Sequence, residues 1–300
     1  MPQSLLCPDA FLSPLEIDDV VTRALTEDLG RAGDVTSIAT IPKDATAHAI
    51  VVARKAGVIA GLPLVAAAFR KLAPDVAITP HARDGTSVAT KTALMHVTGQ
   101  ARAVLAAERV ALNLLGHLSG VATATHELVR RVKGARTRIC CTRKTTPGLR
   151  ALEKYAVRCG GGVNHRFGLD DAVLIKDNHI ALAGNIRTAI ERAKANAGHL
   201  VKIEVEVDTL AQLEHALALG VDAVLLDNMT VDDLRKAVAM ADGKVITEAS
   251  GRITVATAPA IAATGVDLIS VGWVTHSAAA LDIGLDYLEI AQQRTGSADA

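Results

Sequence analysis

The strongest constraint on the fold is a rhythm in the second half of the chain, where short apolar runs alternate with helical segments. Six such runs occur: Ile139–Thr142, Ala172–Lys176, Val201–Val207, Ala223–Asp227, Val245–Glu248 and Leu268–Gly272. From Lys176 onward they recur about every 20 to 30 residues, the length of one strand–loop–helix unit. This alternation predicts a parallel β-sheet, either open or closed.

Six strands do not complete an eight-stranded barrel. The segment from 139 to 275 is also shorter than the roughly 250 residues that such a barrel takes. We therefore predict an α/β fold built on an incomplete six-stranded α/β barrel. The alternative is an open doubly wound sheet, which is weakened because no Gly-x-Gly-x-x-Gly follows the first strand.

The first half of the chain has a different pattern. A helix is predicted from Pro14, with Ser13 as its N-cap, and a polar loop over Asp28–Ser37. Strand-like stretches follow between residues 45 and 96, interrupted by a helical segment at 60–73, and a long helix is predicted over 101–132. These signals predict a small antiparallel sheet layered with helices.

Composition excludes several classes of function. The chain has 32 Lys+Arg and 32 Asp+Glu, which argues against binding nucleic acid by bulk charge. Aromatic residues make up 2%, too few for base-stacking platforms. We expect no membrane span and no signal peptide, because no long apolar run exists and the first residues lack a basic segment.

The cysteines point to a reducing compartment. They are Cys7, Cys140, Cys141 and Cys159, without zinc-ligand spacing and too few for a disulfide framework. We expect a cytoplasmic, enzyme-sized protein.

Positive charge follows the first two strands of the second half. Cations cluster within Thr142–Arg150, and the triple glycine Gly160–Gly162 precedes a His-Arg pair. Each feature alone also fits a solvated basic loop or a flexible glycine loop. Together they predict a pocket for a polyanionic small molecule, because Arg offers forked donors to carboxylate and phosphate. The pocket would contain Arg143, Lys144, His165, Arg166 and Lys176.

Carboxylates follow the next strands. Glu204 and Glu206 share one strand face, and Asp227 ends the next strand. They would bind Mg²⁺ or ribose hydroxyls, or stabilise a cationic transition state; alternatively they cap helices or pair with lysines in a structural network. Small residues at the last two strand ends, in Glu248–Gly251 and Val271–Gly272, predict a phosphate site or ordinary strand-to-helix turns.

Several motifs resemble one known family. They lie within Glu27–Ser37, Glu108–Thr123, Thr142–Arg150, Gly160–His179 and Glu204–Val207. Together they resemble the quinolinate phosphoribosyltransferases, over about residues 15 to 288. The resemblance implies a dimeric enzyme, or an assembly of such dimers, with an N-terminal α/β sandwich domain (1–116) and a barrel domain (117–276). Residues 277–300 would pack back on the first domain.

The same resemblance implies a reaction and a set of site residues. Quinolinate and 5-phosphoribosyl 1-diphosphate would give nicotinate mononucleotide, diphosphate and CO₂, with Mg²⁺ held mainly through substrate, near Glu206 and Asp227. Catalysis would involve Lys144, Glu206 and Asp227. Quinolinate would be bound by Arg143, His165, Arg166, Lys176 and, from the neighbouring subunit, Arg109. The sugar donor would be bound by Thr142, Lys144, Glu206, Asp227, Ser250, Gly251, Arg252, Val271, Gly272 and Trp273.

One departure from the family pattern stands at the phosphate loop. Ser-Gly-Gly is expected, and this chain has Ser250-Gly251-Arg252. The Arg252 side chain would either point away or add a phosphate contact. Two rival functions remain: a phosphoribosyltransferase for nicotinate or another ring, and a catalytically silent ligand-binding relative. The presence of Lys144, Glu206 and Asp227 speaks against the silent relative.

Overall fold

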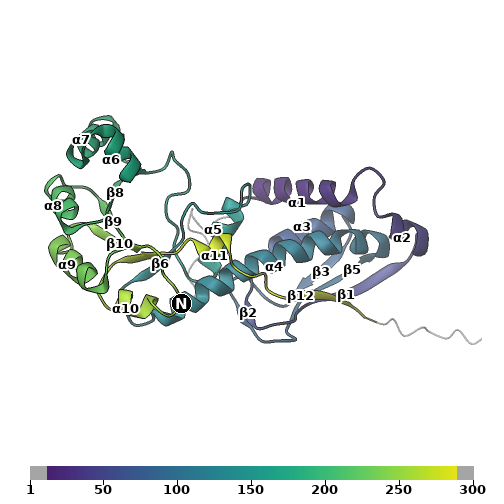
Figure 1. Ribbon diagram of the computed structural model, residues 1–300. Coiled ribbons are helices and arrows are strands. Elements are labelled where there is room, and N and C mark those ends of the chain that lie inside the picture. Colours follow the sequence, from purple (N-terminus) through teal and green to yellow (C-terminus); the bar gives the residue numbers. More distant parts are fainter. Residues whose placement is uncertain (1–11, 289–300) are drawn as a thin grey trace, which may run out of the picture. The chain divides into compact units, whose positions relative to one another are not determined.

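The structure is a computed structural model that describes residues 12–288 (Figure 1). Its described residues divide into two compact units, Leu12–Gly120 with residues 280–288, and Val121–Ala279. The predicted boundaries, 116/117 and 276/277, lie a few residues before these divisions. The parts of the predicted domains at 1–11 and 289–300, together with Cys7 and the start used for the signal-peptide prediction, lie outside the described residues.

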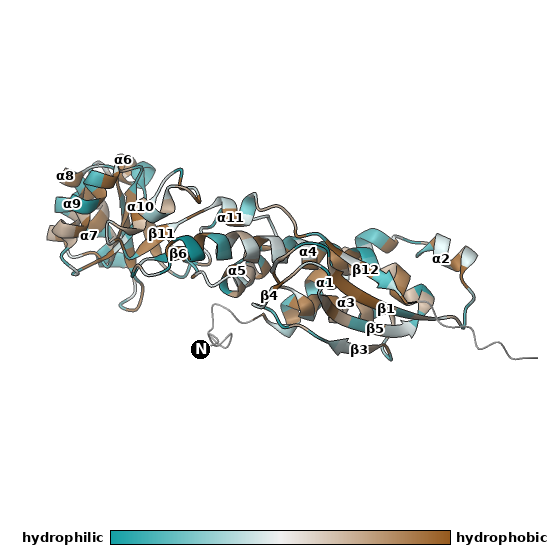
Figure 2. Cartoon of the chain, turned by 90° about the horizontal axis from the view of Figure 1, so that it is seen from below, coloured by the Kyte–Doolittle hydropathy of each residue, from teal (hydrophilic) through white to brown (hydrophobic). Residues whose placement is uncertain are grey.

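The first unit is built on a four-stranded antiparallel sheet. Its order is β12 (Ile283–Tyr287), β1 (Thr46–Ala53), β5 (Ala93–Gln100) and β3 (Ala77–Pro80). The last strand of the described chain therefore pairs with the first. Figure 2 shows apolar residues along β1, and its Ala49, Val51 and Ala53 are buried. A separate two-stranded ladder joins β2 (Gly57–Val58) and β4 (Ser87–Val88).

Helices form the second layer of this unit. They are α1 (Pro14–Leu29), α2 (Val35–Thr40), α3 (Leu62–Leu72) and the first part of α4 (Ala101–Arg131). Ser13 caps α1 by accepting a hydrogen bond from the N–H of Leu15, as predicted. The prediction of a loop over Asp28–Ser37 was wrong at both ends. Helix α1 continues to Leu29. Asp34 accepts a hydrogen bond from the N–H of Ser37 and starts α2.

The second unit contains the predicted incomplete barrel. Six parallel strands run in the order β6 (Arg138–Cys140), β11 (Leu268–Ser270), β10 (Ile246–Ser250), β9 (Ala223–Asp227), β8 (Ile203–Val207) and β7 (Val173–Ile175). Apart from the break between the first strand β6 and the second strand β7, strands that follow one another in the chain lie side by side. This is the order of a barrel left open at one seam, and the doubly wound alternative is excluded.

Helices follow the strands of this unit. They are α5 (Arg150–Cys159), α6 (Asp177–Ala183), α7 (Ile186–Asn196), α8 (Leu210–Ala218), α9 (Val231–Ala241), α10 (Ala258–Ala262) and α11 (Trp273–His276). Along β8 the valines and Ile203 are buried, while Glu204 and Glu206 share the opposite face, as the alternation predicts. Among the described residues, no helix is both long and apolar enough to cross a membrane.

The triple glycine allows two helices to pack closely and does not form a flexible loop. A Cβ on Gly160 would lie 2.4 Å from the carbonyl oxygen of Ala122 and 2.7 Å from the Cβ of Thr125. A Cβ on Gly162 would lie 2.7 Å from the Cγ2 of Thr125. These glycines let the end of α5 pack directly against α4, and so they fix the segment that leads to His165.

We predict that Gly160→Ala lowers the free energy of unfolding by about 1–3 kcal/mol, because the added methyl group has no space. Gly160 has φ −73°, which alanine adopts freely, so backbone strain does not contribute. The matched control is Gly198→Ala, which is exposed and would meet nothing closer than 3.8 Å. Urea unfolding of both variants tests this, and equal stabilities would contradict it.

Candidate active site

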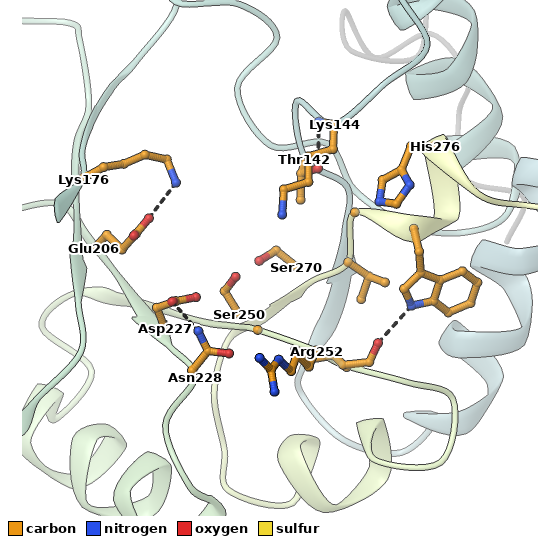
Figure 3. A pocket seen from close by; sticks show the side chains of 15 residues that line it. Thr142, Lys144, Lys176, Glu206, Asp227, Asn228, Ser250, Arg252, Ser270 and His276 are labelled. Carbon is orange, nitrogen blue, oxygen red and sulfur yellow. Dashed lines mark hydrogen bonds and ion pairs between the residues drawn. The ribbon is translucent and has the colours of Figure 1, made fainter. Parts of the chain in front are cut away.

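The carboxyl ends of the six strands surround two adjoining cavities. The first, called here the polar cavity, has a volume of about 490 Å³ (Figure 3). The second, called here the cationic cavity, has a volume of about 290 Å³. Side chains shared by both walls are Thr142, Lys144, Lys176, Ser250 and Ser270. The two cavities therefore form neighbouring subsites of one site.

The predicted site residues divide between these cavities. All ten residues predicted for the sugar donor line the polar cavity, together with Asn228, Ile253, Ser270 and His276. Four of the residues predicted for quinolinate line the cationic cavity: Arg143, His165, Arg166 and Lys176. The fifth, Arg109, is an exposed residue of α4 in the other unit and lines neither cavity. Their binding roles stay predictions.

The loop after β10 lines part of the polar cavity. Gly251 has φ +104°, and a Cβ there would lie 2.2 Å from the Oδ1 of Asn228, so glycine is required. The next residue, Arg252, also has a left-handed backbone, with φ +45°. Its side chain lines the cavity. This observation favours the second of the two expectations for Arg252, a side chain available to a ligand.

The two carboxylates of the polar cavity each have a polar neighbour. Nζ of Lys176 lies 2.6 Å from Oε2 of Glu206, and Nδ2 of Asn228 donates to Oδ2 of Asp227 at 2.5 Å. The second oxygen of each carboxylate has no hydrogen bond from the described chain. Hard oxygen donors of this kind suit Mg²⁺, which keeps several waters and binds through one or two carboxylates plus substrate phosphates. The residues therefore fit the predicted metal.

The arginines of the cationic cavity have unused hydrogen-bonding capacity. Nε of Arg143 and Nε of Arg166 are both buried without a hydrogen-bond partner in the described chain. One terminal nitrogen of Arg166 donates to the carbonyl of Ala172 at 2.8 Å. Burial, with the charge of Arg143, lowers the pKa of Arg166. Two guanidinium groups held close together with free donors can bind carboxylates, which would satisfy the donors and separate the like charges.

His165 is held by both of its ring nitrogens. The backbone N–H of Arg166 donates to Nδ1 at 2.7 Å, and Nε2 lies 2.9 Å from Oε2 of Glu204. Burial lowers the pKa of His165, but the hydrogen bond to Glu204 and the charge of Glu248 outweigh it and raise the pKa. The bond to Nδ1 requires that nitrogen to be unprotonated, so the structure fixes the tautomer with hydrogen on Nε2. His165 can bind an added anion only by exchanging one of these partners.

Glu248 is the carboxyl group that sequence reasoning did not assign. Its side chain is 2% exposed, its Oε1 has no hydrogen-bond partner, and it lines the cationic cavity. Burial and then the charge of Glu204 raise its pKa to about 7. His165, Glu204 and Glu248 place one ligand atom each within 4.8 Å of one another. The alternation of β10 could have indicated an inward-facing acid, but not its isolation from water.

A second unassigned group is Lys154 of α5, which is fully buried. Its Nζ donates to the carbonyl of His165 at 2.9 Å and to Sγ of Cys141 at 3.1 Å. Lys154 thus joins α5 to Cys141, the residue after β6, and to the backbone of His165, which lines the cationic cavity. No sequence signal distinguishes this lysine from an exposed helical one.

Comparison with known proteins identifies relatives over most of the chain. "Quinolinate phosphoribosyl transferase, N-terminal domain" matches residues 34–119, and "Quinolinate phosphoribosyl transferase, C-terminal domain" matches 121–286. A "probable nicotinate-nucleotide pyrophosphorylase (carboxylating)" of Bacillus subtilis is 44% identical over 92% of this chain and 94% of its own. The nicotinate-nucleotide pyrophosphorylase (carboxylating) of Mycobacterium leprae is 43% identical, over 92% of this chain and 100% of its own length. The solved nicotinate-nucleotide pyrophosphorylase of Francisella tularensis matches with a TM-score of 0.90 and 38% identity, over 93% of this chain and 99% of that one.

We predict that Glu248→Gln stabilises the protein at alkaline pH. The carboxyl has a pKa of about 7 when folded against 4.5 ordinarily, so its contribution to stability is lost as pH rises from 4.5 through 7. Glutamine removes this loss, and the free energy of unfolding relative to the parent should rise by about 3 kcal/mol between pH 4 and 8. Urea unfolding at both values measures it; a difference independent of pH would contradict the assignment.

Proposed function

This chain belongs to the quinolinate phosphoribosyl transferase family, and from that premise we propose that its two cavities bind the two substrates of one transfer reaction. The phosphoribosyl group of 5-phosphoribosyl 1-diphosphate passes to quinolinate with decarboxylation. The products are nicotinate mononucleotide, CO₂ and diphosphate, in the biosynthesis of NAD. The observation that carries the proposal is a cavity lined by two half-buried arginines, whose buried Nε atoms have no partner in the described chain, next to a cavity suited to phosphates.

Quinolinate binds in the cationic cavity. It is a pyridine with carboxylates on adjacent ring carbons, so it needs several cations at one end. The free donors of Arg143 and Arg166, with Lys176 between the cavities, support this assignment. A charge-assisted hydrogen bond contributes roughly 1.5–3 kcal/mol. His165 keeps its predicted place at this subsite, where Glu204 orients its ring.

The sugar donor binds in the polar cavity. The small residues at the ends of β10 and β11, Gly251 and Gly272, allow phosphate oxygens to approach backbone N–H groups. Arg252 adds a positive charge there. Lys144 holds the diphosphate with Thr142, and Figure 3 shows both side chains pointing into the cavity. Val271 and Trp273 complete the wall, with the indole N–H of Trp273 bound to the carbonyl of Ile253.

The reaction joins the substrate in the cationic cavity to the sugar of the substrate in the polar cavity. The pyridine nitrogen attacks C1 of the ribose while diphosphate leaves, and positive charge develops at C1. Glu206 and Asp227 bind the ribose hydroxyls and offset that charge. Mg²⁺ would be held mainly through the substrate, near these two carboxylates, and would supply charge neutralisation for the departing diphosphate. The ring nitrogen is then cationic and stabilises the carbanion that CO₂ leaves behind at the adjacent carbon.

The proposal includes a partner and a compartment. Arg109 of a second copy completes the quinolinate subsite, so the active form is a homodimer or an assembly of dimers. Nucleic acid and membrane are not partners. Cys140 and Cys141 are free thiols, which supports a reducing compartment, and we expect the cytoplasm.

We predict that quinolinate is used at least 100-fold better than nicotinate. Nicotinate lacks one of the two carboxylates, so at least one cation of the cavity would lose its hydrogen-bond partner when nicotinate binds, which is unfavourable. Release of CO₂ and diphosphate from each acid, with the sugar donor present, gives both kcat/KM values. Equal values would favour the rival that uses a monocarboxylate, and the absence of turnover with either acid would favour the silent relative.

We predict that two inactive variants restore activity when mixed. Arg109→Ala damages the site that Arg109 enters, whereas Lys144→Ala damages the site of its own chain. In a heterodimer one site carries both changes and the other carries neither. Mixed chains should therefore recover up to about a quarter of the parental activity under random pairing into dimers. Recovery of nothing, while heterodimers are demonstrated by differently tagged copies, would refute the shared site.

A further inference from the structure

Among the described residues that line the cationic cavity, Glu248 is the one carboxyl group. A carboxylate is unfavourable in a subsite for a dianion, because it repels the ligand and weakens the arginines around it. The protein nevertheless buries Glu248 there, with Oε1 free of any hydrogen-bond partner. A protonated Glu248 carries no charge and therefore does not repel an anionic ligand in this cavity.

Its surroundings keep that proton in place. Burial disfavours the charged form, and Glu204 on β8 adds a like charge. The opposing groups are His165, whose Nε2 is 3.7 Å away, Lys154 of α5, and the hydroxyl of Ser270, which donates to the carboxyl group. The balance raises the pKa of Glu248 to about 7, where an acid serves general catalysis best.

The proposed reaction requires one proton in the cationic cavity. When the bond between ring carbon C2 and its carboxylate breaks, CO₂ leaves and the electron pair stays on C2. That carbon becomes the C–H of nicotinate mononucleotide only after it takes up a proton. A cavity that binds quinolinate through its carboxylates holds C2 against its own wall, so a wall residue is suited to deliver it.

We propose that Glu248 is the general acid that protonates C2, an inference that rests on the proposed function. The O–H bond of Glu248 breaks as the C2–H bond forms, and Glu248 is left as a carboxylate beside the cationic ring. It regains a proton from water after the product leaves. One proton from solvent thus replaces one CO₂.

The other polar groups of the cavity are less suited. Arg143 and Arg166 do not release protons. Nε2–H of His165 is already donated to Glu204, and Lys176 is paired with Glu206. Lys144, which lines both cavities, is the remaining competitor, with solvent water as the last.

The test is Glu248→Gln, which keeps the size and removes the acid. Formation of nicotinate mononucleotide should fall 10²- to 10⁴-fold. Diphosphate release in a single turnover should stay within about threefold of the parent, and the N-ribosylated dicarboxylate should accumulate, because phosphoribosyl transfer precedes the missing step. The loss of rate above pH 7 should disappear in the variant. Glu248→Asp, which restores an acid at a shorter reach, should recover part of the rate.

Three results would overturn the proposal. Turnover within threefold of the parent with an unchanged pH profile assigns the proton to Lys144 or water. Parallel loss of quinolinate binding and diphosphate release, in a variant whose thermal melt shows it folded, makes Glu248 structural. Stoichiometric zinc or manganese in the parent protein, absent from the variant, makes the His165–Glu204–Glu248 cluster a metal site. If the parent itself releases no diphosphate from quinolinate and the sugar donor, the proposed function fails instead.

Discussion

The gathering of positive charge at one rim of the barrel is the constraint on which the arrangement of this unit depends. Charges removed from water are costly unless they find partners. The chain supplies partners for some of them: Lys176 has Glu206, and the buried Lys154 has a carbonyl and a thiol. Arg143 and Arg166 keep buried nitrogens without partners in the described chain. Binding of an anionic substrate, as proposed, would give these nitrogen atoms partners and balance their charge.

Most of these cations belong to the long segment between β6 and β7, the two strands on either side of the open seam of the barrel. A closed eight-stranded barrel would continue from β6 to further paired strands. Here the chain between β6 and β7 instead forms a long rim segment that contains α5, the triple glycine and the His-Arg pair. Close glycine packing against α4 and the bonds of Lys154 hold this segment. This segment contributes Arg143, Lys144, His165 and Arg166 to the wall of the cationic cavity.

Sequence reasoning predicted much of this site for a simple reason. Period-two alternation gives the strands, and parallel strands bring their carboxyl ends together, so residues far apart in the chain could be assigned to one rim. The binding roles came from the family resemblance. Lys154 and Glu248 were missed because burial of a charged residue is decided by packing between elements: a lysine in a helix is usually exposed, and the neighbours of Glu248 depend on strand register. The start of α2 was missed because Asp34 was taken as part of a polar loop rather than as a cap.

Arg252 illustrates how a departure from a family pattern can be accommodated. A left-handed backbone costs a residue with a Cβ roughly 1–2 kcal/mol relative to glycine, and Arg252 adopts it directly after Gly251, which is itself left-handed and confined by Asn228. The loop therefore keeps the conformation that glycine would favour. Its side chain lines the polar cavity. One charge-assisted hydrogen bond to a phosphate there would contribute roughly 1.5–3 kcal/mol of binding free energy. The two energies are similar, so a phosphate bound at the proposed donor site would offset the backbone strain of Arg252.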